Sequence, residues 1–308
     1  MQTGSGVSTR IQAVQSNTDP VLIIGNFDGV HTGHRAVIEA AGAHGPVVAV
    51  TFTPHPLQLL RPDKAPRLLT STERRRELLL ACGVADVVEI PFTREVSQWS
   101  PAEFVERALL PLRPCRVVVG TNFRFGHRAA GTPDTLVELA DGRFDVEVLP
   151  LRQGVSSTRI REAVASGDVV AANRMLGRPF RYSEAVVEGH RRGHELGFPT
   201  ANLPVDPSRV APADGVYAGW LTRLDEPDAV PMPAAISVGT NPTFDDVLAT
   251  VVEGHVLDRT DLELYGVPVA VDFIDRLRGN VRFDGLDALI AQMTTDVADV
   301  RRRLSSAD

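Results

Sequence analysis

Two histidines, His31 and His34, stand three residues apart in a glycine-rich segment that directly follows the apolar run Val21–Ile24. That run predicts a buried strand, and the alanine-rich stretch 35–41 predicts a helix. Residues three apart share one face of a helix, and a helix N-terminus offers free backbone N–H groups and the positive end of its dipole. The segment therefore predicts an anion site with two imidazoles directed into it, which suits the phosphates of a nucleotide. The alternative is a tight turn with a partly buried histidine pair.

Three further polar segments stand where predicted strands end or a predicted helix begins, namely Thr51–Pro56, Gly120–Gly126 and Val155–Arg161. Open α/β sheets bind ligands at the carboxyl ends of their strands, so these segments fall where a nucleotide site would be built. Taken singly, each has a plainer reading: a rigid proline loop, an edge of the core, and a cluster of helix-capping hydroxyls. As a cap, the last segment also exposes N–H groups, and hydroxyls beside Arg161 would hold polyphosphate well.

The second half of the chain carries a different chemical set. Thr200 and Asn202 stand two positions apart, and in an extended chain their hydroxyl and amide oxygens can share one hard cation such as Mg²⁺. Gly189, Gly193 and Gly197 allow close approach of the backbone to phosphate. The alternative is a glycine-rich hairpin with a proline turn.

Apolar β-branched runs alternate with helical patterns as far as about residue 180. The predicted strands are Val21–Ile24, Val47–Phe52, Val87–Ile90, Val117–Gly120 and Val146–Leu149. The predicted helices are Arg35–Ala43, Ser71–Cys82, Pro101–Leu110 with Ser100 as N-cap, Thr132–Ala140, and a last stretch from Ser157 to Met175 that ends at Gly177. This alternation predicts a parallel, doubly wound sheet.

From about Arg181 the pattern changes to strand-like runs separated by Gly, Pro, Asn and Asp turns. The predicted strands are Ala185–Glu188, Val216–Leu221, Ala234–Val238, Thr250–Leu257 and Val267–Ile274. That spacing indicates an antiparallel barrel or sandwich. The final stretch, Leu286–Leu304, has one apolar stripe and predicts an amphipathic helix packed on the sheet.

Composition limits the class of protein. The 308 residues exceed the usual size of one core, which favours two domains, and the net charge of −7 argues against nucleic acid as a bulk partner. Cys82 and Cys115 share no metal-ligand spacing, so we expect reduced thiols and a cytoplasmic protein. The polar stretch 1–20 predicts no signal peptide, and no apolar run is long enough to predict a membrane span.

The turn containing His31 and His34 resembles the HxGH signature of the nucleotidylyltransferase superfamily, and the Gly-Asn-Phe-Asp-Gly at 25–29 narrows the resemblance to the bacterial bifunctional riboflavin kinase/FAD synthetase family. The resemblance implies a Rossmann-like FMN adenylyltransferase domain, residues 1–180, in which both histidines stabilise charge developing on the phosphates. It also implies nucleotide- or flavin-binding roles at Asn26, Phe27, Asp28, Gly33, Asn122 and Arg124, although Phe27 could equally serve only in packing. Binding of the triphosphate is implied for Ser156, Ser157, Thr158 and Arg161.

The Pro-Thr-Ala-Asn at 199–202 is similar to a mark of riboflavin kinases, and the stretches 215–219, 239–244 and 250–258 agree with it. The resemblance implies a six-stranded β-barrel riboflavin kinase domain, residues 181–308, with a C-terminal helix. Glu253 would be its general base, and Gly189, Gly193, Thr200 and Asn202 would bind ATP, the last two through Mg²⁺. Flavin contacts are implied near Arg278–Phe283. The family usually has other residue types where His190, Arg191 and His194 stand, and its 261–266 loop is one residue shorter; both departures bear on the ATP affinity of the kinase.

We therefore expect an α/β domain followed by an antiparallel barrel, which together convert riboflavin to FMN and FMN to FAD with ATP and Mg²⁺. The expected partners are riboflavin, FMN and ATP, with no nucleic acid and no membrane; a homo-oligomer is left open. The alternatives are a nucleotidylyltransferase for another phosphorylated small molecule and a non-catalytic flavin-binding protein. An RNA-binding barrel is a weaker alternative, against which the acidic balance counts.

Overall fold

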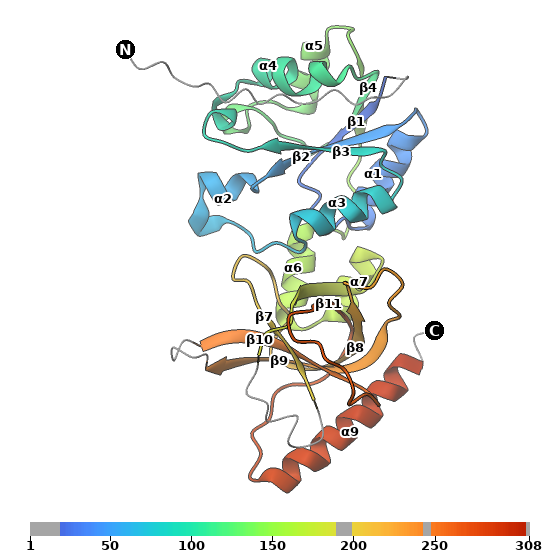
Figure 1. Ribbon diagram of the computed structural model, residues 1–308. Coiled ribbons are helices and arrows are strands. Elements are labelled where there is room, and N and C mark those ends of the chain that lie inside the picture. Colours follow the sequence, from blue (N-terminus) through green and yellow to red (C-terminus); the bar gives the residue numbers. More distant parts are fainter. Residues whose placement is uncertain (1–18, 189–198, 243–247, 306–308) are drawn as a thin grey trace. The chain divides into compact units, whose positions relative to one another are not determined.

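The computed structural model describes residues 19–188, 199–242 and 248–305, and the chain divides into two compact units between Val155 and Ser156 (Figure 1). The first unit is built on a parallel sheet, and the second on an antiparallel, nearly closed barrel. Each unit is described by itself below. Among the described residues, no helix is both long and apolar enough to cross a membrane.

The sheet of the first unit has the strand order β3-β2-β1-β4-β5, with every neighbouring pair parallel. Its strands are β1 (Val21–Ile24), β2 (Val47–Thr53), β3 (Asp86–Pro91), β4 (Arg116–Gly120) and β5 (Asp145–Leu149). The strand order reverses between β1 and β4, and such a switch point opens a crevice at the carboxyl ends of the two strands. All five strands were predicted, to within one residue at each end.

Helices cover both faces of this sheet (Figure 1), because alternate residues of each strand point to opposite sides. Val21 and Ile23 pack with one core cluster, which includes residues of α1 and α3, whereas Leu22 and Ile24 pack with another under α4 and α5. The helices are α1 (Thr32–Gly42), α2 (Pro56–Leu60), α3 (Thr72–Ala81), α4 (Pro101–Phe104) and α5 (Pro133–Ala140).

Two predicted helices differ from the observed ones. Helix α1 begins at Thr32, three residues before the predicted start, because the His31 side chain caps it. The predicted helix 101–110 has its expected cap at Ser100, but it is α-helical only through Phe104 and continues as a π-helical turn (Val105–Leu109) and a 3-10 turn (Leu110–Leu112). Pro111, which lacks an N–H group, stands in that last turn and cannot continue an α-helix.

The barrel of the second unit has the strand order β6-β11-β8-β9-β10-β7. Its strands are β6 (Phe180–Ala185), β7 (Ala201–Pro204), β8 (Gly215–Arg223), β9 (Met232–Pro242), β10 (Leu248–Val256) and β11 (Pro268–Arg278). The first and last strands in this order meet through a bridge between Val187 and Asn202 and through the Tyr182 hydroxyl, which donates to Pro204 O over 3.1 Å. The barrel predicted from the resemblance is thus confirmed.

Large buried side chains fill the interior of this barrel. Phe180, Tyr182, Tyr217 and Phe273 are among the largest fully buried side chains of the chain, and the Tyr217 ring meets the Phe273 ring edge-on at 5.3 Å. Burial raises the pKa of Tyr217 to about 12, even though Arg276 opposes this shift. Interior residues alternate with outward-facing ones along each strand, so polar groups of the barrel face outwards.

Three elements of the second unit were predicted incorrectly. Strand β6 occupies 180–185 rather than 185–188, because its alternate aromatic residues enter the core. The short strand β7 was missed, since it lies within a motif rich in glycine and proline. The predicted helix 157–175 is two helices, α6 (Ser157–Ser166) and α7 (Val169–Leu176): Gly167 adopts a left-handed φ of 83°, and Asp168 caps α7.

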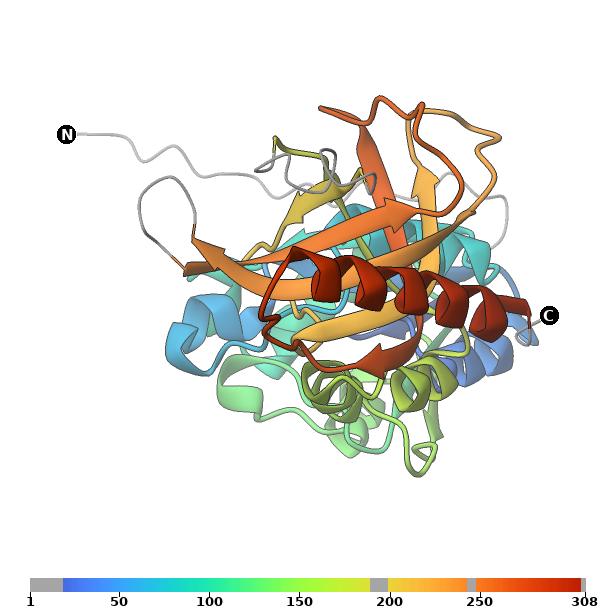
Figure 2. The ribbon, with the colours of Figure 1, turned by 90° about the horizontal axis from the view of Figure 1, so that it is seen from below.

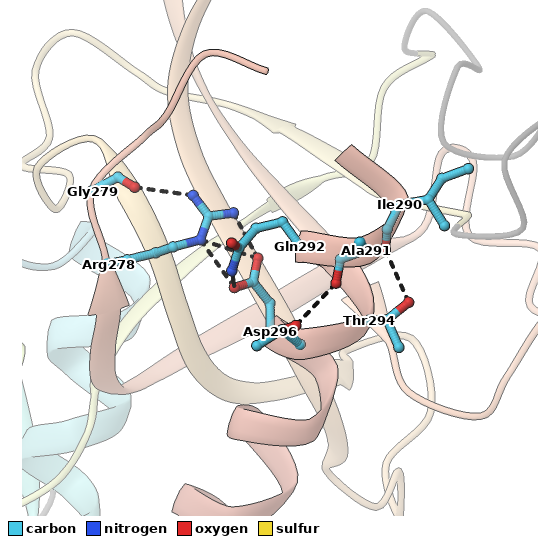
Figure 3. A network of polar contacts seen from close by, with 8 residues as sticks. Arg278, Gly279, Ile290, Ala291, Gln292, Thr294 and Asp296 are labelled. Carbon is cyan, nitrogen blue, oxygen red and sulfur yellow. Dashed lines mark hydrogen bonds and ion pairs between the residues drawn. The ribbon is translucent and has the colours of Figure 1, made fainter. Parts of the chain in front are cut away.

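The predicted C-terminal helix is present as α9 (Leu286–Ser305) and crosses the outer face of the barrel (Figure 2). Its buried Val300 and Leu304 pack with Ala218 of β8. A buried ion pair adds to this packing: the guanidinium of Arg278, at the end of β11, donates to both oxygens of Asp296 over 2.6–3.2 Å, and Gln292 donates to Asp296 over 2.9 Å (Figure 3).

Candidate active sites

The turn that follows β1 winds through three left-handed positions. Phe27, Gly29 and Val30 have φ angles of 49°, 82° and 39°, which is costly for the two residues that carry a Cβ atom. The Phe27 side chain is buried and packs edge-on against the His34 ring at 5.2 Å. Packing therefore accounts for Phe27, and strain of this kind is concentrated at functional sites.

His31 and His34 lie ring on ring, with centroids 3.6 Å apart and planes 13° apart. His31 is the N-cap of α1, and its Nδ1 atom accepts a hydrogen bond from the backbone N–H of His34 over 3.3 Å. A ring nitrogen that accepts carries no proton, so the neutral His31 ring holds its proton on Nε2. A Cβ atom at Gly33 would lie 3.2 Å from the His31 ring, which explains glycine at that position.

Burial lowers the pKa of His34 well below its usual value, and the neighbouring His31 lowers it further. His34 is therefore neutral at neutral pH. Its Nδ1 atom is buried and has no hydrogen-bond partner within the part of the chain that the structure describes. A neutral imidazole with an unmatched nitrogen beside a helix N-terminus can hydrogen-bond an anionic ligand without repelling a second protonated ring.

Asp28 points into the protein and holds a distant segment. Its carboxylate accepts from the backbone N–H groups of Leu69 and Thr70 over 3.0–3.1 Å and from the Thr70 hydroxyl over 3.2 Å. The side chain is 3% exposed. These bonds give Asp28 a clear role in positioning the 69–70 segment beside the turn.

Asn26 connects the turn after β1 to the turn after β2. Its side-chain amide lies 3.2 Å from Nε2 of His55, whose Nδ1 atom accepts from the Leu57 N–H over 3.2 Å. His55 in its neutral form thus carries its proton on Nε2. The Asn26 atom that faces it is Nδ2, and since two donors do not pair, the hydrogen bond forms with the oxygen and nitrogen of the amide exchanged. His55 was not among the predicted site residues, because the Thr-Pro-His-Pro run that contains it also fits a rigid proline loop.

The remaining predicted residues of the first site lie on two other segments. Asn122 and Arg124 are exposed just beyond β4, at the carboxyl edge of the sheet, and Arg124 donates to Phe123 O over 2.7 Å. Ser156 caps α6 and accepts from the Arg159 N–H over 3.2 Å. Ser157, Thr158 and Arg161 occupy the first turns of the same helix, which belongs to the second compact unit.

The second candidate site is a polar row on the outer face of the barrel. Glu253 of β10 is paired directly with Asn202 of β7 on one side and with Ser237 of β9 on the other. Side chains directly opposite in antiparallel strands have Cβ atoms about 5 Å apart and lie on the same face. All three side chains are half-buried, whereas their neighbours Val252, Leu203 and Val238 are buried in the interior. Ser237 was not predicted as a site residue, because only the strand register brings it to Glu253.

Thr200 and Asn202 follow the expected extended path. The Asn202 amide nitrogen donates to the Thr200 carbonyl over 3.3 Å, so the amide oxygen is the atom left to meet a ligand. His255, two residues beyond Glu253, has its Nδ1 atom 3.0 Å from Pro199 O; since a carbonyl only accepts, that nitrogen carries the proton. His255 thereby ties the start of the Pro-Thr-Ala-Asn segment to β10.

Gly189, Gly193 and the unusual residues His190, Arg191 and His194 lie outside the described residues. In the 261–266 loop, Asp261 forms a two-bond ion pair with Arg259 over 2.6–3.0 Å, which lowers the pKa of the carboxyl group. Over the ranges 19–188, 199–242 and 248–305, no group of three or more His, Cys, Asp or Glu residues could hold a metal ion.

The described residues offer two polar sites, a histidine pair at a helix N-terminus beside the parallel sheet and an outward-facing Asn–Glu–Ser row on the antiparallel barrel. Residues 13–162 match the model of the FAD synthetase family, and residues 176–304 match that of the riboflavin kinase family. The family matches to this chain make it a transferase. The chain belongs to the family of bifunctional riboflavin kinase/FMN adenylyltransferases.

Named relatives agree over nearly the full length. The bifunctional riboflavin kinase/FMN adenylyltransferase of Listeria monocytogenes is 35% identical over 93% of both chains, and that of Escherichia coli is 35% identical over 96% of both chains. A crystal structure of a protein from Streptococcus pneumoniae described as a macrolide-efflux protein has a TM-score of 0.82 and 30% identity, covering 93% of this chain and 95% of that one.

Proposed function

We propose that this chain makes FMN and FAD at two separate sites, through the residues described above. The second unit phosphorylates riboflavin to FMN with ATP, and the first adenylylates FMN to FAD with release of pyrophosphate. The observation that carries the proposal is that each matched domain gathers polar groups suited to its reaction: His31 with His34 in one, and Glu253 with Asn202 in the other.

In the kinase reaction, Glu253 acts as general base. It removes the proton from the terminal ribityl hydroxyl as that oxygen attacks the γ-phosphorus of ATP, and ADP leaves. Thr200 and Asn202 supply hard oxygen ligands, and the orientation of the Asn202 amide leaves its oxygen available, which fits Mg²⁺. When bound, Mg²⁺ would neutralise the charge of the phosphates. Gly189 and Gly193 are proposed to approach the phosphates through their backbone.

In the adenylylation reaction, a phosphate oxygen of FMN attacks the α-phosphorus of ATP in line, and the bond to pyrophosphate breaks. Two anions must meet, so the protein contributes mainly positioning and charge stabilisation. His31 can donate from Nε2, and neutral His34 can hydrogen-bond without adding a repelling charge beside it. Both groups face charge that develops on the phosphates as the new bond forms.

The other residues of the first site have supporting roles in this proposal. Asn26, Asn122 and Arg124 contact the nucleotide or flavin, and Gly33 leaves room for the His31 ring. Phe27 and Asp28 shape the turn from inside. On the resemblance, the triphosphate is held by four residues at the start of α6, namely Ser156, Ser157, Thr158 and Arg161. The FAD synthetase match extends to residue 162 and so includes them.

The domain boundary at 180/181 is retained as part of the proposal; the compact units divide after Val155, and the two family matches leave 163–175 between them. A cytoplasmic location is supported by Cys82 and Cys115, both of which are free thiols. The net charge of −7 supports small molecules, and not nucleic acid, as partners.

The decisive experiment incubates the purified chain with riboflavin, ATP and Mg²⁺ and separates the flavins by chromatography over time. FMN followed by FAD is the expected result, and omission of Mg²⁺ should stop FMN formation. FMN without FAD would favour another phosphorylated substrate for the first unit. No product, with riboflavin bound, would favour a non-catalytic flavin-binding protein.

A further inference from the structure

Arg75 differs from the arginines on either side of it in α3. Arg74 pairs at the surface with Glu77 over 2.8 Å, and Arg76 pairs with Asp86 over 3.0 Å. Arg75 is only 6% exposed. Burying a charged group costs free energy unless hydrogen bonds and opposite charges compensate it, so the partners of Arg75 indicate its structural role.

The guanidinium of Arg75 joins the turn that follows β1 to the last two residues of β2. One nitrogen donates to Asn26 O over 3.3 Å, and another donates to Phe52 O over 3.4 Å and to the Thr53 hydroxyl over 3.0 Å. The Thr53 hydroxyl in turn donates a hydrogen bond to the Glu89 carboxylate of β3 over 3.1 Å. The planar, rigid fork of an arginine suits such a bridge between a turn and a strand end better than the compact ammonium of a lysine does.

The charge of Arg75 is balanced by its surroundings. Burial lowers its pKa, and the carboxylates of Glu89, Asp28 and Glu73 act in the opposite direction. Asp28 is the buried residue that holds the 69–70 segment. Arg75 therefore hydrogen-bonds residues at the carboxyl ends of β1 and β2, and its charge is compensated in part by Glu89 of the neighbouring strand β3.

The bond to Asn26 O is the one that reaches the predicted nucleotide site. That carbonyl also accepts from the buried Thr51 hydroxyl over 3.4 Å, so both of its lone pairs are used and the peptide is fixed in direction. Asn26 in turn contacts His55 through its amide and precedes the left-handed Phe27. A shift of this peptide would move both the amide and the turn that leads to His31.

We propose that Arg75 is a positioning residue for adenylyl transfer: it fixes the Asn26 peptide and the Asn26–His55 contact without touching substrate. The inference rests on the proposed function of the first unit. Since a displacement of about 1 Å can cost about 100-fold in rate, removal of this arginine should lower FAD formation strongly.

The test compares Arg75→Met and Arg75→Lys with the matched surface control Arg74→Met in the full chain. For each, kcat and KM for FMN are measured with excess ATP, together with FMN formation from riboflavin and the thermal midpoint. In Arg75→Met we expect kcat for FAD formation to fall by about 10- to 100-fold. Arg75→Lys should recover part of this loss, and Arg74→Met and the kinase reaction should remain as in wild type.

A second measurement reads the geometry without activity. Ring ¹⁵N shifts of His55, identified with a His55→Gln variant, should report the Nε2–H tautomer in wild type and should move in Arg75→Met but not in Arg74→Met. Unchanged His55 shifts with wild-type FAD formation would overturn the inference, as would an equal loss of both reactions together with a lowered thermal midpoint. If Arg75→Met does not fold, Arg75→Lys decides: unchanged kcat and unchanged shifts would reject the role. If wild-type protein makes no FAD from FMN, the proposed function fails, and the His55 shifts still test Arg75.

Discussion

Glu253 of β10 lies directly opposite Asn202 of β7, as the Cα partner of that residue in the antiparallel pairing of the two strands. This register places a carboxylate and an amide on one outward face, with Ser237 on the other side of Glu253. A one-residue slip of β7 would turn Asn202 into the interior and break the set. The arrangement of Asn202, Glu253 and Ser237 in the proposed kinase site therefore depends on strand register.

Glu253→Gln should abolish FMN formation and spare FAD formation from supplied FMN. A glutamine has nearly the same shape but cannot take a proton, and the loss of a general base lowers kcat by about 100- to 10,000-fold. Chromatography of flavins after incubation with riboflavin or with FMN measures both reactions. Glu226→Gln, at an exposed glutamate of the same unit, is the matched control. Equal loss of both reactions in folded protein would contradict separate sites.

His34 should make the first unit less stable in mild acid. Its folded-state pKa lies below the 6.5 of the unfolded chain, so as pH falls through 6.5 the unfolded state takes up a proton that the native state does not. The free energy of unfolding should then fall by up to about 1.4 kcal/mol per pH unit from this group alone, until the folded-state pKa is reached. Trp99 fluorescence in a Trp220→Phe background follows the first unit, and His34→Asn should flatten the profile. An unchanged slope in that variant would argue against a buried neutral His34.

Asp28→Asn separates two roles for that residue. Asparagine sets an NH2 group where Oδ2 now accepts from the Leu69 N–H over 3.1 Å, so two donors face each other, and we expect a cost of about 2 kcal/mol. Unfolding of the first unit, followed by Trp99, measures this, with the exposed Asp63→Asn as control. If stability is unchanged while the KM for FMN or ATP rises, Asp28 lines the substrate site, and its role in holding the loop is wrong.

The Arg278–Asp296 pair should anchor α9 to the barrel. Removal of one partner, in Asp296→Asn, leaves a poorly paired charge and should destabilise the second unit by about 3 kcal/mol. Replacing both, as Arg278→Met with Asp296→Leu, should cost less, because no charge is left without its partner. Urea unfolding monitored by Trp220, which packs beneath α9, reports the effect. The exposed pair at Arg259 is the comparison: Arg259→Gln should change stability by less than about 1 kcal/mol.

Local pattern was enough to predict the five parallel strands, because Val- and Ile-rich runs between helices are buried on both sides. It was also enough to place His31 and His34 together at the start of a helix. The first turn of α1 was missed because histidine is an unusual N-cap, and the cap bond from the His34 N–H depends on the local backbone geometry.

Contacts between distant segments account for what the sequence could not show. Asp28 binds Thr70, which is 42 residues away, and no motif marks that pairing. Three consecutive arginines at 74–76 are equivalent in composition, and only the packing of α3 against the sheet selects Arg75. Ser237 joins Glu253 through strand register alone. Strand β7 was hidden by glycine and proline, although its Asn202 and the preceding Thr200 were singled out for their chemistry.

The barrel of the second unit can bind a ligand only on its outer face. Its interior is occupied by Tyr182, Tyr217 and Phe273, so an isoalloxazine ring must be met from outside. Strand alternation therefore separates two properties: inward-facing side chains determine the stability of the domain, and outward-facing ones at the site determine which ligand it binds. Outward residues away from α9 can be exchanged to recognise a modified flavin or a different nucleotide with little effect on the interior, which makes this half of the enzyme a favourable starting point for redesign.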